Sequence, residues 1–315
     1  MGLPASIGIV GGMGPWVDPL LLQKLLSYQS ALGMCRDQEA IPVVLAQFSA
    51  LLEDRTECLA ALEAGRASGN PAIPAARVAR LLAAAGARVV GIPCNTFHAP
   101  AIFEVFEREL AELSRGEDRL EVVHMIRAAV EAVRKVRAGL RRVGVLSTNG
   151  TYLHRIYAAT LEEHGLEAVT LPYEPRPMPA EERAARRDAI LGGRLTPLQN
   201  DVHHAISDAA WGIKSGRQAG EGYPAPRAVL KAAARRLPEA GAEALILGCT
   251  EIPLALGPAD VPELPMTDPL EALARELVEA WRRRFNPAWP AARELPFLPG
   301  WSGPENGRSG AGAVR

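Results

Sequence analysis

Short aliphatic runs alternate along the chain with longer stretches rich in alanine, leucine and arginine. The aliphatic runs have few polar positions, which is typical of strands that are buried on both faces of a sheet. The longer stretches have the composition of helices. This alternation predicts parallel sheets with helices on both faces. The predicted strands are Ile7–Val10, Pro42–Gln47, Val89–Ile92, Leu120–Val123, Val143–Leu146, Ala168–Leu171 and Ala244–Leu247.

Three segments of the first half of the chain recur in the same order in the second half. Ile7-Gly-Ile-Val-Gly-Gly resembles Val143-Gly-Val-Leu-Ser-Thr, the segment around Cys94 resembles that around Cys249, and Leu120–Met125 resembles Leu264–Asp268. This repeat predicts an α/β fold of two pseudo-symmetric lobes, each a mainly parallel sheet flanked by helices. The carboxyl ends of the strands would face a cleft between the lobes, and we expect the active site there.

The repeat and a change of composition suggest how the chain is divided. We expect residues 1–125 and 267–285 to form the first lobe and residues 126–266 to form the second. Residues 286–315 hold ten glycines and prolines and have no hydrophobic periodicity. We therefore expect an extended or mobile tail there.

Composition and charge exclude several classes of protein. Apolar residues make up 48% and charged residues 23% of the chain, which is ordinary for a globular protein and excludes wholesale disorder. Lys plus Arg number 35 against 36 for Asp plus Glu, so no charge pattern predicts binding to nucleic acid or to a membrane surface. No apolar run is long enough to span a membrane, and no signal peptide is evident. We expect a soluble, cytoplasmic protein.

The cysteines are candidates for chemistry rather than for disulfides or metal. The four cysteines form no CxxC pair, and the histidines form no HExxH motif, so we expect neither a disulfide framework nor a metal. Cys94 and Cys249 each follow a predicted strand, precede a helix-prone stretch, and occupy equivalent points of the repeat. A helix N-terminus favours the thiolate. Cys35 and Cys58 have no such counterpart, and we interpret them as structural.

Two thiols on opposite sides of a cleft suit the inversion of a carbon centre. That reaction removes a proton from one face of the carbon and returns a proton to the other. The ordinary pKa of a thiol, about 8.5, is close enough to neutral for its surroundings to bring it into the working range of a general base. One thiolate and one thiol could then exchange roles with the direction of the reaction.

Several motifs along the chain show a family resemblance. They are Gly11-Gly-Met-Gly-Pro15, Asp37-Gln38, Asp54-Arg-Thr56, Asn70-Pro71, Pro93-Cys-Asn-Thr96 with His98, Gly144 through Thr151, and Leu247-Gly-Cys-Thr-Glu-Ile252. Together, from residue 6 to about 280, they resemble the aspartate/glutamate racemase family, most closely its cofactor-independent aspartate racemase branch. The resemblance implies two α/β lobes, no cofactor, a homodimer, and Cys94 and Cys249 as the two catalytic bases.

The same resemblance implies residues that bind substrate. Arg55 matches the family's DRT element, and Lys214, one of only four lysines, matches its IKxG element. In the family both bind substrate carboxylates, which suits a dicarboxylic amino acid, and their charges would acidify the Cα–H. Further substrate-binding residues implied in this way are Met13, Asn95, Thr96, Thr148 and Thr250. Glu251 and His98 are expected in supporting roles, with a structural role favoured for His98.

Departures from the family pattern leave the substrate open. The segment Trp16-Val-Asp-Pro19 stands where relatives carry smaller residues, Phe97 replaces an alanine, and Arg127-Ala-Ala129 replaces acidic residues. We expect the two aromatic residues near the cleft to affect which side chain is accepted. Alternatives are a racemase or isomerase for glutamate, a bulkier amino acid, a hydantoin or maleate, a thiol hydrolase that uses Cys94 with His98, and a binding module without catalysis. The residues do not favour a dinucleotide or pyridoxal phosphate site.

Overall fold

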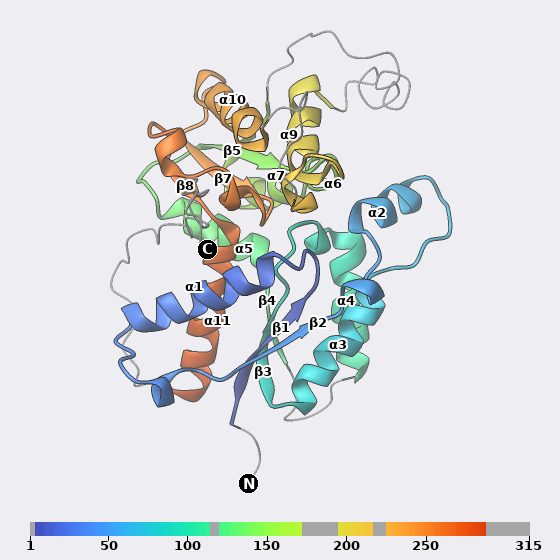
Figure 1. The fold of residues 1–315 in the computed structure, drawn as a ribbon, viewed down its shortest axis with the longest axis vertical. Coiled ribbons are helices and arrows are strands. Elements are labelled where there is room, and N and C mark those ends of the chain that lie inside the picture. Colours follow the sequence, from blue (N-terminus) through green and yellow to red (C-terminus); the bar gives the residue numbers. More distant parts are fainter. Residues whose placement is uncertain (1–3, 114–119, 172–194, 217–224, 288–315) are drawn as a thin grey trace, which may run out of the picture.

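The computed structural model describes residues 4–113, 120–171, 195–216 and 225–287. Within them, eight strands form two parallel sheets of four strands each (Figure 1). The predicted fold of two α/β lobes is confirmed, each lobe being one sheet with its flanking helices. The predicted tail lies almost wholly outside the described residues. The strands are β1 (Ser6–Gly11), β2 (Val43–Gln47), β3 (Ala87–Gly91), β4 (Glu121–Val123), β5 (Arg142–Ser147), β6 (Glu167–Val169), β7 (Ala244–Gly248) and β8 (Met266–Thr267).

The two sheets share one strand order. It is β2-β1-β3-β4 in the first lobe and β6-β5-β7-β8 in the second. The register agrees as well, because Ile7 of β1 pairs with Val89 of β3 and Val143 of β5 pairs with Ala244 of β7. The repeat seen in the sequence is therefore a repeat of topology.

One glycine recurs at the centre of the repeat for a packing reason. A Cβ atom on Gly8 of β1 would lie 2.9 Å from the Cβ of Ala87, and one on Gly144 of β5 would lie 2.9 Å from Cδ1 of Leu237. Such distances are too short for real side chains. Glycine at both positions lets the neighbouring helix or strand pack directly on the strand backbone.

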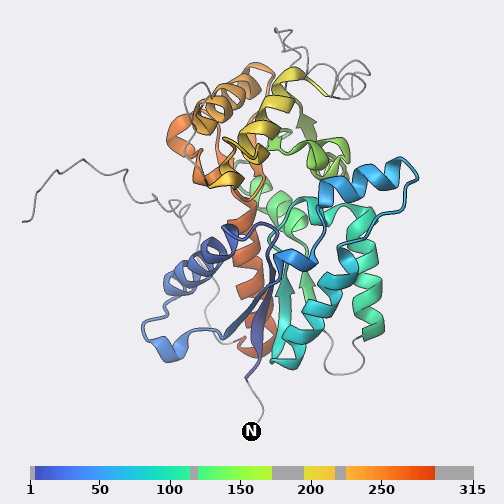
Figure 2. The same cartoon turned by 45° about the vertical axis from the view of Figure 1, so that its right-hand side comes forward.

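Helices cover both faces of each sheet. In the first lobe, α3 and α4 pack together on one face, while α1 and α11 pack together on the other (Figures 1 and 2). In the second lobe, α9 and α10 pack together against β5 and β7. The helices are α1 (Val17–Ala31), α2 (Arg55–Glu63), α3 (Ala72–Ala84), α4 (Pro100–Leu113), α5 (Met125–Arg134), α6 (Asn149–Leu153), α7 (Ile156–Glu163), α9 (Pro197–Ser207), α10 (Pro226–Glu239) and α11 (Pro269–Phe285).

The last described helix returns to the first lobe. Although α11 follows β8 of the second sheet, Leu273 and Leu277 lie against the backbone of Gly91 in β3. The indole Nε1 of Trp281 donates a 2.9 Å hydrogen bond to the carbonyl oxygen of Ala5. The chain therefore crosses between the lobes twice, once before α5 and once before α11, and these two helices pack against each other.

A continuous apolar core joins the lobes on the side of α5. One buried cluster includes Val90 of the first sheet, Ile126 and Val130 of α5, and Val143 and Ile246 of the second sheet. Because closely packed cores deform little, this contact fixes how the strand ends of the two lobes face each other. In the part of the chain that the structure describes, no helix is both long enough and apolar enough to cross a membrane.

Candidate active site

Both predicted catalytic cysteines line one cavity between the lobes. Cys249 directly follows β7, and Cys94 lies three residues beyond β3, its counterpart in the first sheet. The two side chains line the same cavity of about 300 Å³, and the residues are only 5% and 6% exposed. The cavity thus lies at the carboxyl ends of equivalent strands, where open α/β sheets bind ligands.

The turn after each cysteine differs from the prediction. Instead of an α-helix, a single turn of 3₁₀ helix follows, Thr96–His98 after Cys94 and Ile252–Leu254 after Cys249. In the first lobe α4 begins only at Pro100, because the residue before a proline is driven to extended backbone, as Ala99 is. The expected stabilisation of a thiolate by a helix N-terminus is therefore wrong, because no long helix begins at either cysteine.

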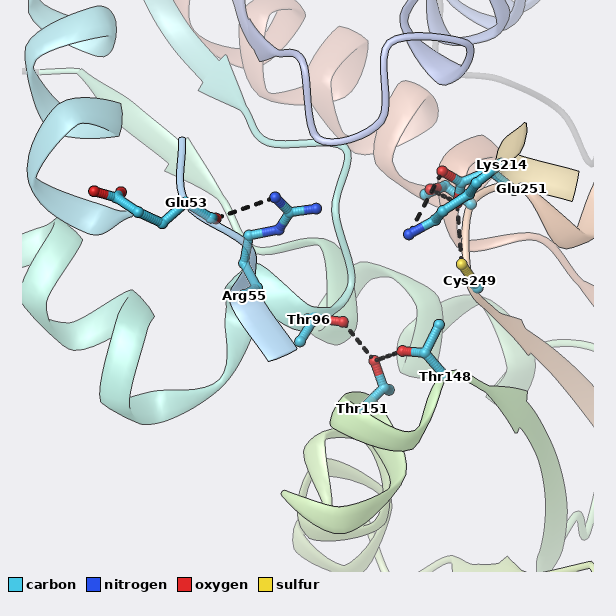
Figure 3. A network of polar contacts seen from close by, with 9 residues as sticks. Glu53, Arg55, Thr96, Thr148, Thr151, Lys214, Cys249 and Glu251 are labelled. Atoms are coloured by element: carbon cyan, nitrogen blue, oxygen red, sulfur yellow. Dashed lines mark hydrogen bonds and ion pairs between the residues drawn. The ribbon is translucent and has the colours of Figure 1, made fainter. Parts of the chain in front are cut away.

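Glu251 and Lys214 form a charged group around Cys249. The thiol of Cys249 donates a 3.0 Å hydrogen bond to Oε2 of Glu251, and the hydroxyl of Thr250 donates to the same oxygen at 3.0 Å (Figure 3). Burial raises the pKa of Cys249 well above its ordinary value, and the charge of Glu251 raises it further, while Lys214 lowers it. Cys249 is therefore held as a neutral thiol, which is a proton donor.

Arg55 lies on the other side of the cavity, near Cys94. It is the first residue of α2, whose N-terminus is capped by the carboxylate of Asp54, and its Nη1 donates a 3.2 Å hydrogen bond to the carbonyl oxygen of Glu53. Burial by itself lowers the pKa of Arg55, but the charges of Cys94 and Asp54 raise it above its ordinary value. The buried Nε has no hydrogen-bond partner among the described residues. Arg55 therefore offers a donor to a ligand.

Lys214 provides a second cation from the second lobe. It lies in the 3₁₀ turn Ile213–Ser215, and its Nζ is 3.9 Å from Oε1 of Glu251. Burial lowers the pKa of Lys214, but the charges of Glu251, Cys249 and Cys94 outweigh this effect, so that it stays protonated. Figure 3 shows the ends of Arg55 and Lys214 directed toward one another across the site.

Neutral hydrogen-bonding groups complete the cavity wall. Thr96 and Thr151 share a 2.9 Å hydrogen bond between their hydroxyls, and the hydroxyl of Thr148 donates to that of Thr151 at 3.4 Å (Figure 3). The phenol of Tyr157 donates to Oδ1 of Asn95. Since Asn95 and Thr96 follow β3 while their partners belong to α6 and α7, both bonds join the two lobes. Among the described residues no cluster of three or more His, Cys, Asp or Glu side chains is arranged to hold a metal ion.

Comparison with known proteins identifies the family. The sequence model of the Asp/Glu/Hydantoin racemase family matches residues 26–191, which is more than half of the chain. The chain belongs to this family. Family membership makes it a racemase, but it does not fix the substrate or the groups that move the proton.

Solved structures of racemases share the fold. The aspartate racemase of Picrophilus torridus has a TM-score of 0.61 at 23% sequence identity, and the match covers 88% of this chain and 94% of that one. An aspartate racemase homologue from Pyrococcus horikoshii has a TM-score of 0.54 at 23% identity, covering 87% and 98%. The glutamate racemase of Francisella tularensis, in complex with D-glutamate, has a TM-score of 0.52 at 16% identity, covering 89% and 81%. These matches establish the two-lobe architecture of the racemase.

The structure brings nearly all the predicted site residues together. The cavity is lined by both cysteines, by Glu251 and by every residue predicted to bind substrate: Met13, Arg55, Asn95, Thr96, Thr148, Lys214 and Thr250. Met13 is almost fully buried, so its side chain forms part of an apolar wall. Whether these residues act as the family resemblance implies stays a prediction.

His98 does not line the cavity, and backbone groups hold its ring in a fixed neutral form. Its Nδ1 lies 2.8 Å from the carbonyl oxygen of Cys94, and the backbone N–H of Met125 donates to its Nε2 at 3.2 Å. Burial, and then the nearby His124, lowers the pKa of His98 well below its ordinary value. With Nδ1 donating and Nε2 accepting, His98 holds the Cys94 turn. The geometry favours this structural role over proton transfer, and it does not favour a thiol hydrolase.

The two unusual aromatic residues lie outside the cavity. Phe97 is fully buried and packs edge-on against Phe103 and Phe106 in the core. Trp16 is 63% exposed, and the position of a Cβ on Gly216 would be 3.3 Å from its ring. The expected position near the cleft is therefore wrong for Phe97, whereas Trp16 lies beside the turn that carries Lys214. Any effect of these residues on the choice of substrate stays a prediction. Phe97 lies in the Thr96–His98 turn that follows Cys94, and this turn directs its side chain into the core rather than into the cavity.

Sequence reasoning missed several residues of the site. Asp54, Thr56, Glu57, His203 and Ser207 also line the cavity. Asp54 and Thr56 flank Arg55 in one of the motifs that resemble the family, so this motif could have predicted that both residues lie at the site. No sequence motif pointed to Tyr157, because its hydrogen bond to Asn95 forms only when the two lobes are packed together.

Proposed function

We propose that this chain is a cofactor-independent amino-acid racemase that uses Cys94 and Cys249 as an acid/base pair, and that its substrate is a dicarboxylic amino acid, aspartate before others. The observation that carries the proposal is one cavity lined by a thiol from each lobe and by two cations. A dicarboxylic amino acid carries two carboxylates, and Arg55 and Lys214 could each bind one of them. A neutral hydantoin offers no carboxylate to either cation.

The proposed reaction removes one proton from Cα and adds another proton to the opposite face of Cα. A thiolate at Cys94 takes the Cα proton, and the electron pair of the C–H bond passes into the carboxylate as a carbanion-like intermediate. The thiol of Cys249 then gives its proton to the opposite face of Cα. The cations lower the free energy of this intermediate because negative charge grows on the carboxylate. Starting from the other enantiomer, the roles of the two thiols are reversed.

The arrangement around Cys249 supports its role as the acid. Burial and Glu251 both favour the protonated thiol, and Glu251 orients its hydrogen through the 3.0 Å bond. On the other side of the cavity, Arg55 interacts with Cys94 and has a buried Nε without a partner among the described residues, so it can bind a substrate carboxylate there. Thr250 holds the Glu251 carboxylate in place.

The decisive experiment uses single enantiomers of aspartate, glutamate, bulkier amino acids, a hydantoin and maleate in deuterated water. We expect the mirror form of aspartate to appear with deuterium at Cα, without added pyridoxal phosphate. Cys94→Ser and Cys249→Ser should each lower racemisation by at least about a hundredfold, the lower range for general acid–base catalysis. Cys35→Ser, which changes an exposed thiol, is the matched control.

Each outcome of this experiment bears on a distinct part of the proposal. Full racemisation by either active-site variant would refute the two-base mechanism. Turnover of another substrate in the panel, with aspartate unchanged, would refute the assignment of aspartate. Exchange of the α-proton without inversion in one serine variant, but not in the other, would show which thiol serves which face.

A further inference from the structure

A hydrogen bond between the lobes fixes the residue that follows Cys94. The phenol of Tyr157, in α7 of the second lobe, donates to Oδ1 of Asn95 in the first lobe. Both residues are buried, with exposures of 2% and 4%. Burial, and then the charges of Asp268 and Cys249, raises the pKa of Tyr157 well above its ordinary value. The phenol therefore keeps its proton and acts as a donor.

The other end of the same carboxamide has no partner. Asn95 lines the cavity, and its Nδ2 is buried without a hydrogen bond to any described residue. A buried amide donor that makes no hydrogen bond is costly, so such a group is expected to meet an acceptor when a ligand is bound. With Oδ1 occupied by the phenol, the carboxamide can present only its N–H groups elsewhere.

We propose that Tyr157 is a positioning residue that orients Asn95 so that its amide N–H groups donate to a carboxylate of the substrate. This inference rests on the proposed function, since it takes a dicarboxylic amino acid as the ligand. If the carboxamide turned over, its oxygen would face the substrate carboxylate and repel it. Tyr157 prevents that reversal without touching the substrate.

The position of Tyr157 also links substrate binding to the contact between the lobes. The next residue, Thr96, is bonded to Thr151 of the second lobe in the same way. Both residues after Cys94 therefore depend on the second lobe for their orientation. The cavity has its full set of donors only when the two lobes are packed together.

The test is Tyr157→Phe, which removes the hydroxyl and keeps the buried ring. The probes are aspartate and succinate, a dicarboxylate without an amino group. We expect the KM for aspartate and the Kd for succinate to rise about five- to tenfold, the loss of about one hydrogen bond, with a smaller change in kcat. Tyr152→Phe is the matched control, because it removes a half-buried hydroxyl that makes no hydrogen bond among the described residues.

A double-mutant cycle separates positioning from a general structural effect. In the Asn95→Ala background, Tyr157→Phe should cause no further loss of succinate affinity, because the group on which it acts is absent. An additive loss in that background would overturn the inference. So would wild-type affinity in Tyr157→Phe, whatever the thermal midpoints of the variants.

The outcomes also separate this inference from the proposed function. If the wild-type protein binds succinate but racemises nothing, and Tyr157→Phe weakens binding, the inference holds and the racemase proposal fails. If the wild type racemises aspartate and Tyr157→Phe behaves as Tyr152→Phe does, the inference alone fails. If the wild type does not bind succinate at all, the carboxylate role of Asn95 is refuted.

Discussion

Replacing Glu251 by glutamine tests whether its negative charge keeps Cys249 protonated. The substitution preserves the shape of the side chain and leaves an oxygen that can accept from the thiol. It removes a charge that lies 3.0 Å from Sγ and that, after burial, is the largest cause of the raised pKa of Cys249. Lys214, which acts in the opposite direction, stays in place. We therefore predict that the pKa of Cys249 falls in Glu251→Gln.

The expected size of the effect follows from the distance. Two unit charges 3.0 Å apart repel by about 5 kcal/mol at an effective dielectric constant of about 20. A change of about 1.4 kcal/mol alters a protonation equilibrium tenfold. Even if about a quarter of the repulsion is expressed, the thiolate fraction of Cys249 near neutral pH should rise at least about tenfold.

The rate of alkylation reports this fraction, because only the thiolate reacts with iodoacetamide. Mass spectrometry of the peptide that contains Cys249 separates its reaction from that of the other cysteines. We expect alkylation at pH 7 to be at least about tenfold faster in Glu251→Gln than in wild type. Glu57→Gln is the control, since Glu57 lines the cavity but is not among the groups that shift the pKa of Cys249. An unchanged or slower rate in a folded Glu251→Gln protein would show that the charge does not hold the proton.

Two further predictions concern other groups of the molecule. Lys214→Ala should raise the KM for aspartate about tenfold or more, because a charge-assisted hydrogen bond to a carboxylate is lost. Lys231→Ala, which removes a cation bonded to Asp260 instead, should leave KM unchanged, and an unchanged KM in Lys214→Ala would remove its proposed role. The second prediction concerns stability: burial lowers the pKa of His98 well below its ordinary value and that of His124 to about 4. Because the unfolded chain binds these protons more readily, the free energy of unfolding should fall as pH decreases from about 6.5 towards 4. Urea denaturation at several pH values measures this dependence, and a flat profile in that interval would contradict it.

The sequence was sufficient to predict the architecture, because that information is local and repeated. Aliphatic runs of strand length mark the sheets, and a glycine that recurs at Gly8 and Gly144 marks equivalent strands. Once two halves with the same topology are expected, Cys94 and Cys249 must lie at corresponding strand ends. Their shared cavity follows from that topology.

What the sequence did not predict depends on contacts between distant residues. The hydrogen bond from Tyr157 to Asn95 joins residues of different lobes, so no local pattern reveals it. Phe97 was expected near the cleft but lies in the core. In a tight turn, neighbouring side chains point in different directions, so the sequence alone does not show which of them faces the cavity. The raised pKa of Cys249 likewise depends on the burial of the thiol and on the position of the Glu251 carboxylate beside it. Both are set by the folded structure.

The return of α11 to the first sheet has a consequence for how the protein is made. During synthesis, the strands and helices of the second lobe leave the ribosome before residues 269–285 exist. Until then, the face of β3 that Leu273 and Leu277 will cover has no partner. Domains normally fold as they emerge, starting from the N-terminus. Here the half that is synthesised first is the half that is completed last, and its exposed apolar face is a point at which chaperones or aggregation can act on the nascent chain.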